Sequence, residues 1–156
     1  MHIRRVQSED YYAVKQVINE WWGGRDMAGK LPKFLFDHFQ ETSFIAEEKG
    51  QMTGFLVGFL SQTTTDGAYI HFAGVHPDNR GEGIAEGLYD AFCDCALDEG
   101  RSIIQAVTSP VNEGSVAFHQ AMGFTLIAGD KTENGLPVHT DYDGEKQDRI
   151  LFEKQL

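Results

Sequence analysis

Hydrophobic positions along this chain recur with two different periods, and together they predict strands alternating with helices. Residues 2–6 alternate apolar and polar, as in a short strand. Residues 9–22 keep the spacing of an amphipathic helix, with Ser8 as the expected N-cap and the glycine pair 23–24 as its end. A second short helix is expected over about 31–40, where five large apolar residues cluster.

The middle of the chain predicts a β-meander followed by a long helix. Two apolar runs, 42–48 and 52–62, flank Lys49-Gly50-Gln51, which is typical of a hairpin with a glycine turn. Residues 68–75 form a third strand pattern. The next helix is expected over about 82–99 and ends at a glycine.

The last third predicts a strand at 102–107, a helix over about 113–123, and two strands at 124–128 and 148–156 with a polar loop between them. The order β-α-α-β-β-β-α-β-α-β-β combines an antiparallel meander with a βα alternation. We therefore expect an α/β (α+β) fold in which helices cover both faces of a mixed sheet. At 156 residues, the chain has the size of a single domain spanning 1–156.

Composition narrows the range of partners. The formal net charge of −11 argues against nucleic acid and anionic membranes, while it favours the approach of a cationic amine. Cys93 and Cys95 stand two apart on a predicted helix, so they point to different faces and form neither a pair nor a CxxC site. The N-terminus lacks an apolar signal region, and no run of 18 apolar residues occurs. We expect a cytoplasmic protein.

The stretch His76–Ala85, "HPDNRGEGIA", leads from a strand into a helix and is typical of an anion site. The first amides of a helix lack intrahelical partners, and glycines let a phosphate approach them closely. Arg80 adds positive charge; the alternative is a tight turn without a ligand. A dinucleotide fingerprint is disfavoured because Glu86 stands where the third glycine belongs, and the P-loop pattern is absent.

Two motifs extend this interpretation. "VHPDNRGEGIA" resembles motif A of the GNAT acyl-CoA N-acyltransferase superfamily, through Arg80, Gly83 and Ala85. "NEGSVAFHQAMGF" is similar to motif B of that family, through Asn112 and the closing Gly123-Phe124. The resemblance covers about residues 65 to 156, and the element order of the whole chain agrees with it.

The resemblance implies a mostly antiparallel sheet of about seven strands, splayed between strands 4 and 5. It implies acetyl-CoA as co-substrate, no metal, and direct transfer of the acetyl group to a primary amine of a small molecule in a ternary complex. Homodimers are common in the family. The cofactor residues implied are Ala73, Gly74, Val75, Arg80, Gly81, Glu82, Gly83, Ile84, Ala85, Asn112, Ser115 and Phe118. Asn112 has an alternative role as the N-cap of its helix.

The catalytic residues depart from the family pattern. His119 stands where many members carry a tyrosine that protonates the leaving thiolate; it is either that acid or a packing residue. Tyr69 stands where a catalytic glutamate often lies, and His71 points to the same face two residues later. His71 is either the base for the amine or a strand histidine tied to a neighbour. A backbone N–H near Ala73 would stabilise the oxyanion.

The acceptor wall is the least patterned part of the chain. Trp21, Trp22, Arg25 and His38 are candidates for its rim. The loop 141–149 is expected to hang over the same site. Residues 130–141 match an EF-hand register in part, but a polar hairpin loop is the better interpretation.

Two rival functions stay open at this point. One is an acyl-CoA-binding or regulatory module without turnover, which would bind CoA tightly and acetylate no amine. The other is a protein acetyltransferase that acts on a lysine or an N-terminus, for which an open groove would argue.

Overall fold

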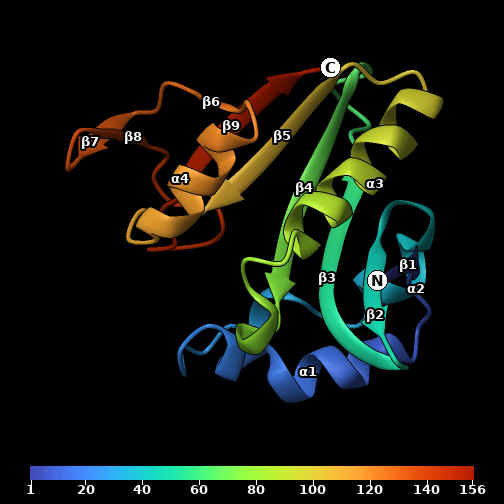
Figure 1. Cartoon of the computed structure of the whole chain (residues 1–156). Coiled ribbons are helices and arrows are strands. Elements are labelled where there is room, and N and C mark those ends of the chain that lie inside the picture. Colours follow the sequence, from blue (N-terminus) through green and yellow to red (C-terminus); the bar gives the residue numbers. More distant parts are fainter.

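The computed structural model describes residues 1–156. Seven strands form one sheet in the order β1-β2-β3-β4-β5-β9-β6, and only β4 and β5 pair in parallel (Figure 1). The strands are β1 His2–Arg5, β2 Phe44–Glu48, β3 Gln51–Leu60, β4 Gly67–Val75, β5 Ile103–Thr108, β6 Thr125–Leu126 and β9 Ile150–Gln155. The predicted sheet of about seven mostly antiparallel strands is confirmed.

Helices cover both faces of the sheet, as predicted. Helices α1 (Asp10–Trp21) and α2 (Phe34–His38) pack with Phe55 and Val57 in one core. Helices α3 (Ile84–Asp98) and α4 (Glu113–Ala121) enclose a second, larger core on the opposite face. Short 3-10 turns lie at Ala28–Lys30, Gln40–Thr42 and Pro77–Asn79. None of the helices is both long and apolar enough to cross a membrane.

Two local expectations for the N-terminal third are wrong. The helix expected over about 31–40 is shorter: α2 covers only Phe34–His38, and its C-cap residue Phe39 leaves the helical conformation, with φ of −120° and ψ of 36°. Ser8 does not cap α1: its hydroxyl accepts from Gln40 Nε2 at 3.2 Å. The Asp10 carboxylate instead accepts the Gln7 N–H at 2.7 Å and pairs with Arg4.

Two tight turns contain glycines at positions of positive φ. Lys49 and Gly50 both have positive φ between β2 and β3, as a two-residue hairpin turn requires. Asn134 and Gly135 do the same between β7 (Lys131–Glu133) and β8 (Leu136–Val138). The partial EF-hand register is thus a small hairpin, whose Asp130 carboxylate accepts hydrogen bonds from Thr140.

The parallel pair β4 and β5 separates before either strand ends. Their ladder joins 67–70 to 103–106 and stops there, although β4 continues to Val75 and β5 to Thr108. The two strands diverge toward the lower part of Figure 1, and α3 runs back along β4 from the point where β4 ends. The predicted splay between strands 4 and 5 is confirmed, and it creates the space for the site.

Candidate active site

A cleft of about 740 Å³ occupies the splay. Its walls come from β4, β5, α3, α4, the segment after α1 and the loop before β9. Most of the residues predicted for the site line it: Trp21, Trp22, Arg25, His71, Ala73, Gly74, Val75, Arg80, Gly81, Gly83, Ile84, Ala85, Asn112, Ser115, Phe118 and His119. Three predicted residues do not line it: Tyr69, Glu82 and His38.

A β-bulge at His71 re-aims β4 inside this cleft. Val57 pairs with Phe72 and Gly58 with Ile70, so His71 has no partner on β3. Ile70 faces the core under α3, and after the bulge Ala73 faces that core again. His71 and Phe72 therefore both point to the opposite face, toward the segment that follows α1.

The end of β4 presents free backbone groups to the cleft. The His76 N–H bonds to Thr53 O at 2.8 Å, so the alternation of an antiparallel pair turns the N–H and C=O of Ala73 and Val75 away from β3. On that side β5 has already diverged. An extended chain with amide groups can pair with this edge as an additional strand would.

Gly74 was expected to contact the cofactor, but its backbone groups do not face the cleft. Its backbone groups face β3 by the same alternation, so they are turned away from the cleft. Its missing side chain matters instead, because a Cβ there would overlap the indole ring of Trp22 and crowd Phe55. The glycine lets the Trp22 ring approach the β4 backbone, where its centroid also lies 4.7 Å from that of the Phe72 ring.

The entrance of α3 has the geometry of an anion cradle. Gly81 and Gly83 both have φ of 83°, and open space lies where a Cβ would project. The first amides of α3 follow directly, at the positive end of the helix dipole. The Glu82 side chain is exposed and accepts a hydrogen bond from Asn79 Nδ2 at 3.0 Å. It therefore does not line the cleft.

Arg80 has a contact that its sequence position did not reveal. Its Nη2 donates to Trp21 O at 2.7 Å, at the C-terminal end of α1, where a cation is favoured by the helix dipole. Because a guanidinium has five N–H donors, Arg80 can hold α1 and still face an anion in the cradle. It joins the anion end of the cleft to the segment that carries Trp22 and Arg25.

Motif B forms the opposite wall. Asn112 Oδ1 accepts the Ser115 N–H at 3.0 Å, so Asn112 is the N-cap of α4, the alternative given for it above. Phe118 packs edge-on at 5.3 Å from the ring of Tyr89 on α3. Asn112, Ser115 and Phe118 all remain in contact with the cleft.

His119 is buried and fully hydrogen-bonded. It is 4% exposed and stacks at 4.4 Å on Phe152. The Ser115 carbonyl can only accept, so Nδ1 carries the proton and donates to it at 2.7 Å; Nε2 then accepts from the Tyr89 hydroxyl at 2.8 Å. Burial lowers the pKa of His119, an effect larger than the opposing one of the Ser115 carbonyl. A neutral His119 therefore has no N–H left to donate.

His71 has the opposite tautomer. Its Nε2 lies 2.7 Å from Lys30 O and must donate the proton, because a carbonyl only accepts. Nδ1 forms no hydrogen bond and keeps its lone pair. His71 lines the cleft and also a smaller cavity of about 450 Å³ beside it.

Tyr69 lies in that smaller cavity, 6.4 Å between ring centroids from His71. Burial raises the pKa of its hydroxyl, so at neutral pH Tyr69 is a hydrogen-bonding group and not a base. The smaller cavity is lined otherwise by neutral side chains, among them Phe59, Gln105 and Tyr142.

Three of the four residues expected at the acceptor rim line the cleft. Trp21, Trp22 and Arg25 are in its wall, whereas His38 is exposed on α2 and lies outside it. Arg25 is exposed and forms no ion pair within the chain.

The loop before β9 also lines the cleft, as the sequence suggested. It supplies Asp143 and Arg149, which pair at 3.0 Å. Lys30 Nζ donates to Asp143 O at 3.1 Å and so ties this loop to the segment over His71. Neither Asp143 nor Tyr89 was predicted individually. For Tyr89, the only signal in the sequence was a polar hydroxyl on a helix that is otherwise apolar on its buried side.

A mixed sheet splayed between its parallel strands, with a glycine-rich helix entrance at one end of the splay, defines the class of the GNAT acyltransferases. A family model described as "Acetyltransferase (GNAT) family" matches residues 7–124. The chain belongs to this family.

Curated relatives are similar over part of their length. The L-2,4-diaminobutyric acid acetyltransferase of Marinococcus halophilus is 28% identical over 56% of this chain and 51% of its own. The L-amino acid N-acyltransferase MnaT of Escherichia coli is 32% identical over 54% and 50%. The chain thus spans about half the length of these relatives. The solved structure of yncA from Salmonella typhimurium with its cofactor acetyl-CoA has a TM-score of 0.70 at 21% identity, covering 100% of this chain and 94% of that one.

The buried state of His119 predicts a pH dependence of stability. The unfolded chain protonates this histidine below about pH 6.5, whereas the folded chain resists protonation because its pKa is lowered. The contribution of His119 to stability is therefore complete above about pH 6.5 and is lost as the pH falls below it. Urea unfolding at about pH 7.5 and about pH 5.5 should show a smaller loss in His119→Gln than in the wild type.

Exposed His38 provides the control, because His38→Gln should keep the wild-type pH dependence. If His119→Gln loses as much stability as the wild type over this interval, the assigned neutral state of His119 is wrong.

Proposed function

We propose that this chain is an N-acetyltransferase that moves the acetyl group of acetyl-CoA to a primary amine of a small, amino-acid-like molecule, by direct attack in a ternary complex. The observation that carries the proposal is a single cleft that joins the amide cradle of α3 to the free Nδ1 of His71. Membership of the GNAT family supports the same activity.

The donor side of the cleft fits acetyl-CoA in two places. The pyrophosphate would accept hydrogen bonds from the amides of Gly81 to Ala85, at the positive end of α3. The pantetheine amides would pair with the free backbone edge of Ala73 and Val75. The solved yncA structure contains acetyl-CoA as its cofactor, which supports this donor.

Gly83→Ala should weaken CoA binding about tenfold or more, because a Cβ would project into the open space of the cradle and strain a residue of positive φ. Gly135→Ala is the matched control. Gly135 has a similar φ of 78° and equally open space, but it lies at the tip of the β7–β8 hairpin. Calorimetry with CoA should separate the two variants. Equal affinities would remove the cradle from the donor site.

The amine side of the chemistry falls to His71. The Lys30 carbonyl fixes the tautomer, so the lone pair of Nδ1 can take a proton from the acceptor ammonium, directly or through a water. The freed amine then attacks the thioester carbonyl, and the N–H of Ala73 faces the oxygen that gains negative charge.

His71→Gln should lower kcat/KM about 100-fold and move the rise in activity to higher pH, where the amine deprotonates unaided. Glutamine can keep the hydrogen bond to Lys30 O but offers no basic nitrogen. His38→Gln, the same change outside the cleft, should leave the pH–rate profile unaltered. A wild-type profile in His71→Gln would exclude His71 as the base.

The acceptor end favours a small amine over a protein segment. Lys30 Nζ donates to Asp143 O, so segments 113 residues apart in the chain meet beside His71. An acceptor would then fit between this contact and the thioester. Arg25 offers an unpaired cation for a carboxylate, whereas the Asp143 carboxylate already pairs with Arg149. The two relatives from Marinococcus halophilus and Escherichia coli are also named for amino-acid acceptors.

A thiol-release assay with acetyl-CoA should therefore find turnover with free amino acids, including 2,4-diaminobutyrate, and little with polyamines or peptides of several residues. Arg25→Gln should raise KM about tenfold for an amino acid and leave KM unchanged for the same amine without its carboxylate. Turnover only with peptides would favour the protein acetyltransferase, and tight CoA binding without any turnover would favour the binding module.

The remaining expectations belong to the proposal as well. A cytoplasmic location stays a prediction. A homodimer stays a prediction.

A further inference from the structure

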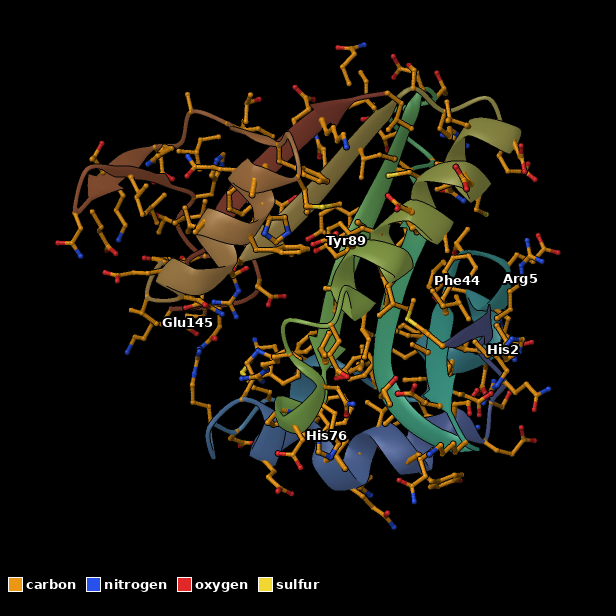
Figure 2. The ribbon with its side chains drawn as sticks, in the orientation of Figure 1. His2, Arg5, Phe44, His76, Tyr89 and Glu145 are labelled. Carbon is orange, nitrogen blue, oxygen red and sulfur yellow. The ribbon has the colours of Figure 1, made fainter.

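The buried pair formed by Tyr89 and His119 is not explained by the family pattern that located the cleft. Both side chains are 4% exposed and both line the cleft. Their hydrogen bond of 2.8 Å joins α3 to α4, and Figure 2 shows Tyr89 between these two helices.

The directions of the hydrogen bonds restrict what each group can do. His119 donates its one proton from Nδ1 to Ser115 O and accepts from Tyr89 at Nε2. The imidazole therefore has no proton for the cleft. The Tyr89 hydroxyl is the only O–H of the pair, and its hydrogen is held on the neutral Nε2 of His119.

The location of Tyr89 fits the reacting part of the donor. The pyrophosphate cradle lies at the start of α3, and His71 lies further along β4, toward its N-terminal half. Helix α3 runs back along β4 from the cradle in this same direction (Figure 1). Tyr89 lies on the second turn of α3 and lines the cleft, so it borders the stretch between phosphate and amine, where the thioester would lie.

We propose that the Tyr89 hydroxyl, held in place by His119, donates a hydrogen bond to the acyl-CoA sulfur as the C–S bond breaks. This inference rests on the proposed function. A thioester sulfur is a weak acceptor, so the O–H stays on Nε2 in the ground state. When the electron pair of the C–S bond moves to sulfur, the thiolate becomes the stronger acceptor and the O–H turns to it. Such an interaction, made only as charge develops, lowers the barrier.

The proton stays on the tyrosine oxygen throughout. Burial raises the pKa of Tyr89, so the phenolate is disfavoured. The departing thiolate takes its proton from water, and the proton that His71 removed from the amine returns to water. In this arrangement Tyr89 is the catalytic residue, and His119 is a positioning residue that aims its O–H.

Three variants separate this role from a direct acid role of His119. Tyr89→Phe and His119→Leu should each lower kcat about 10- to 100-fold with little change in KM for acetyl-CoA. His119→Gln should retain most of the activity, because its amide oxygen can still accept the Tyr89 O–H. Tyr12→Phe, an exposed tyrosine on α1, is the matched control.

Either of two results would overturn the inference. In one, Tyr89→Phe has the kcat of the wild type; in the other, His119→Gln loses as much kcat as His119→Leu. A second measurement needs no turnover. The ultraviolet absorbance of the thiolate of bound CoA, titrated with pH, should show a higher thiol pKa in Tyr89→Phe than in the wild type, because a donor to the thiolate is lost. An unchanged thiol pKa would also overturn it.

Failure of the proposed function has a different signature. If the wild-type protein binds no CoA by calorimetry, the function is wrong. If it binds CoA and acetylates an amine while Tyr89→Phe matches it in both kcat and thiol pKa, only the role of Tyr89 is wrong.

Discussion

The site depends on one interruption in backbone pairing. The parallel ladder of β4 and β5 ends at Ile70 and Ala106, while both strands continue. Unpaired backbone groups inside a fold are costly unless a partner arrives, so an edge left open in this way is suited to an extended ligand that carries amides. The cleft of about 740 Å³ lies where a continuous sheet would have had none.

The cleft depends also on the β-bulge at His71. It lies next to the last paired residue, and it restores the Ala73 and Val75 side chains to the core under α3. Without the extra residue, their side chains and the free edge would be out of register with that core. The same irregularity puts Phe72 on the same face as His71, where the Phe72 ring packs against Trp22. One extra residue thus serves the packing on both faces of the strand.

The sequence predicted the features that depend on local chemistry. Glycine turns, helix periods and the "RGEGIA" loop have physical causes within a few residues. Most of the residues that the resemblance implied for the cofactor line the cleft. Features set by distant partners were missed. His119 was interpreted from its own chain position, but its state is decided by Tyr89, 30 residues away, and by Phe152. His38 is exposed at the end of α2 and does not line the cleft, a placement that its own position in the sequence did not reveal.

The two histidines of the cleft illustrate why residue type alone did not assign their roles. Each donates one ring N–H to a backbone carbonyl, His71 from Nε2 to Lys30 and His119 from Nδ1 to Ser115. The remaining nitrogen is free in His71 and filled by the Tyr89 hydroxyl in His119. A free lone pair suits a base, whereas a filled one in a buried ring suits an acceptor that orders another group. The hydrogen-bond partners, and not the imidazoles themselves, separate the two sides of the proposed reaction.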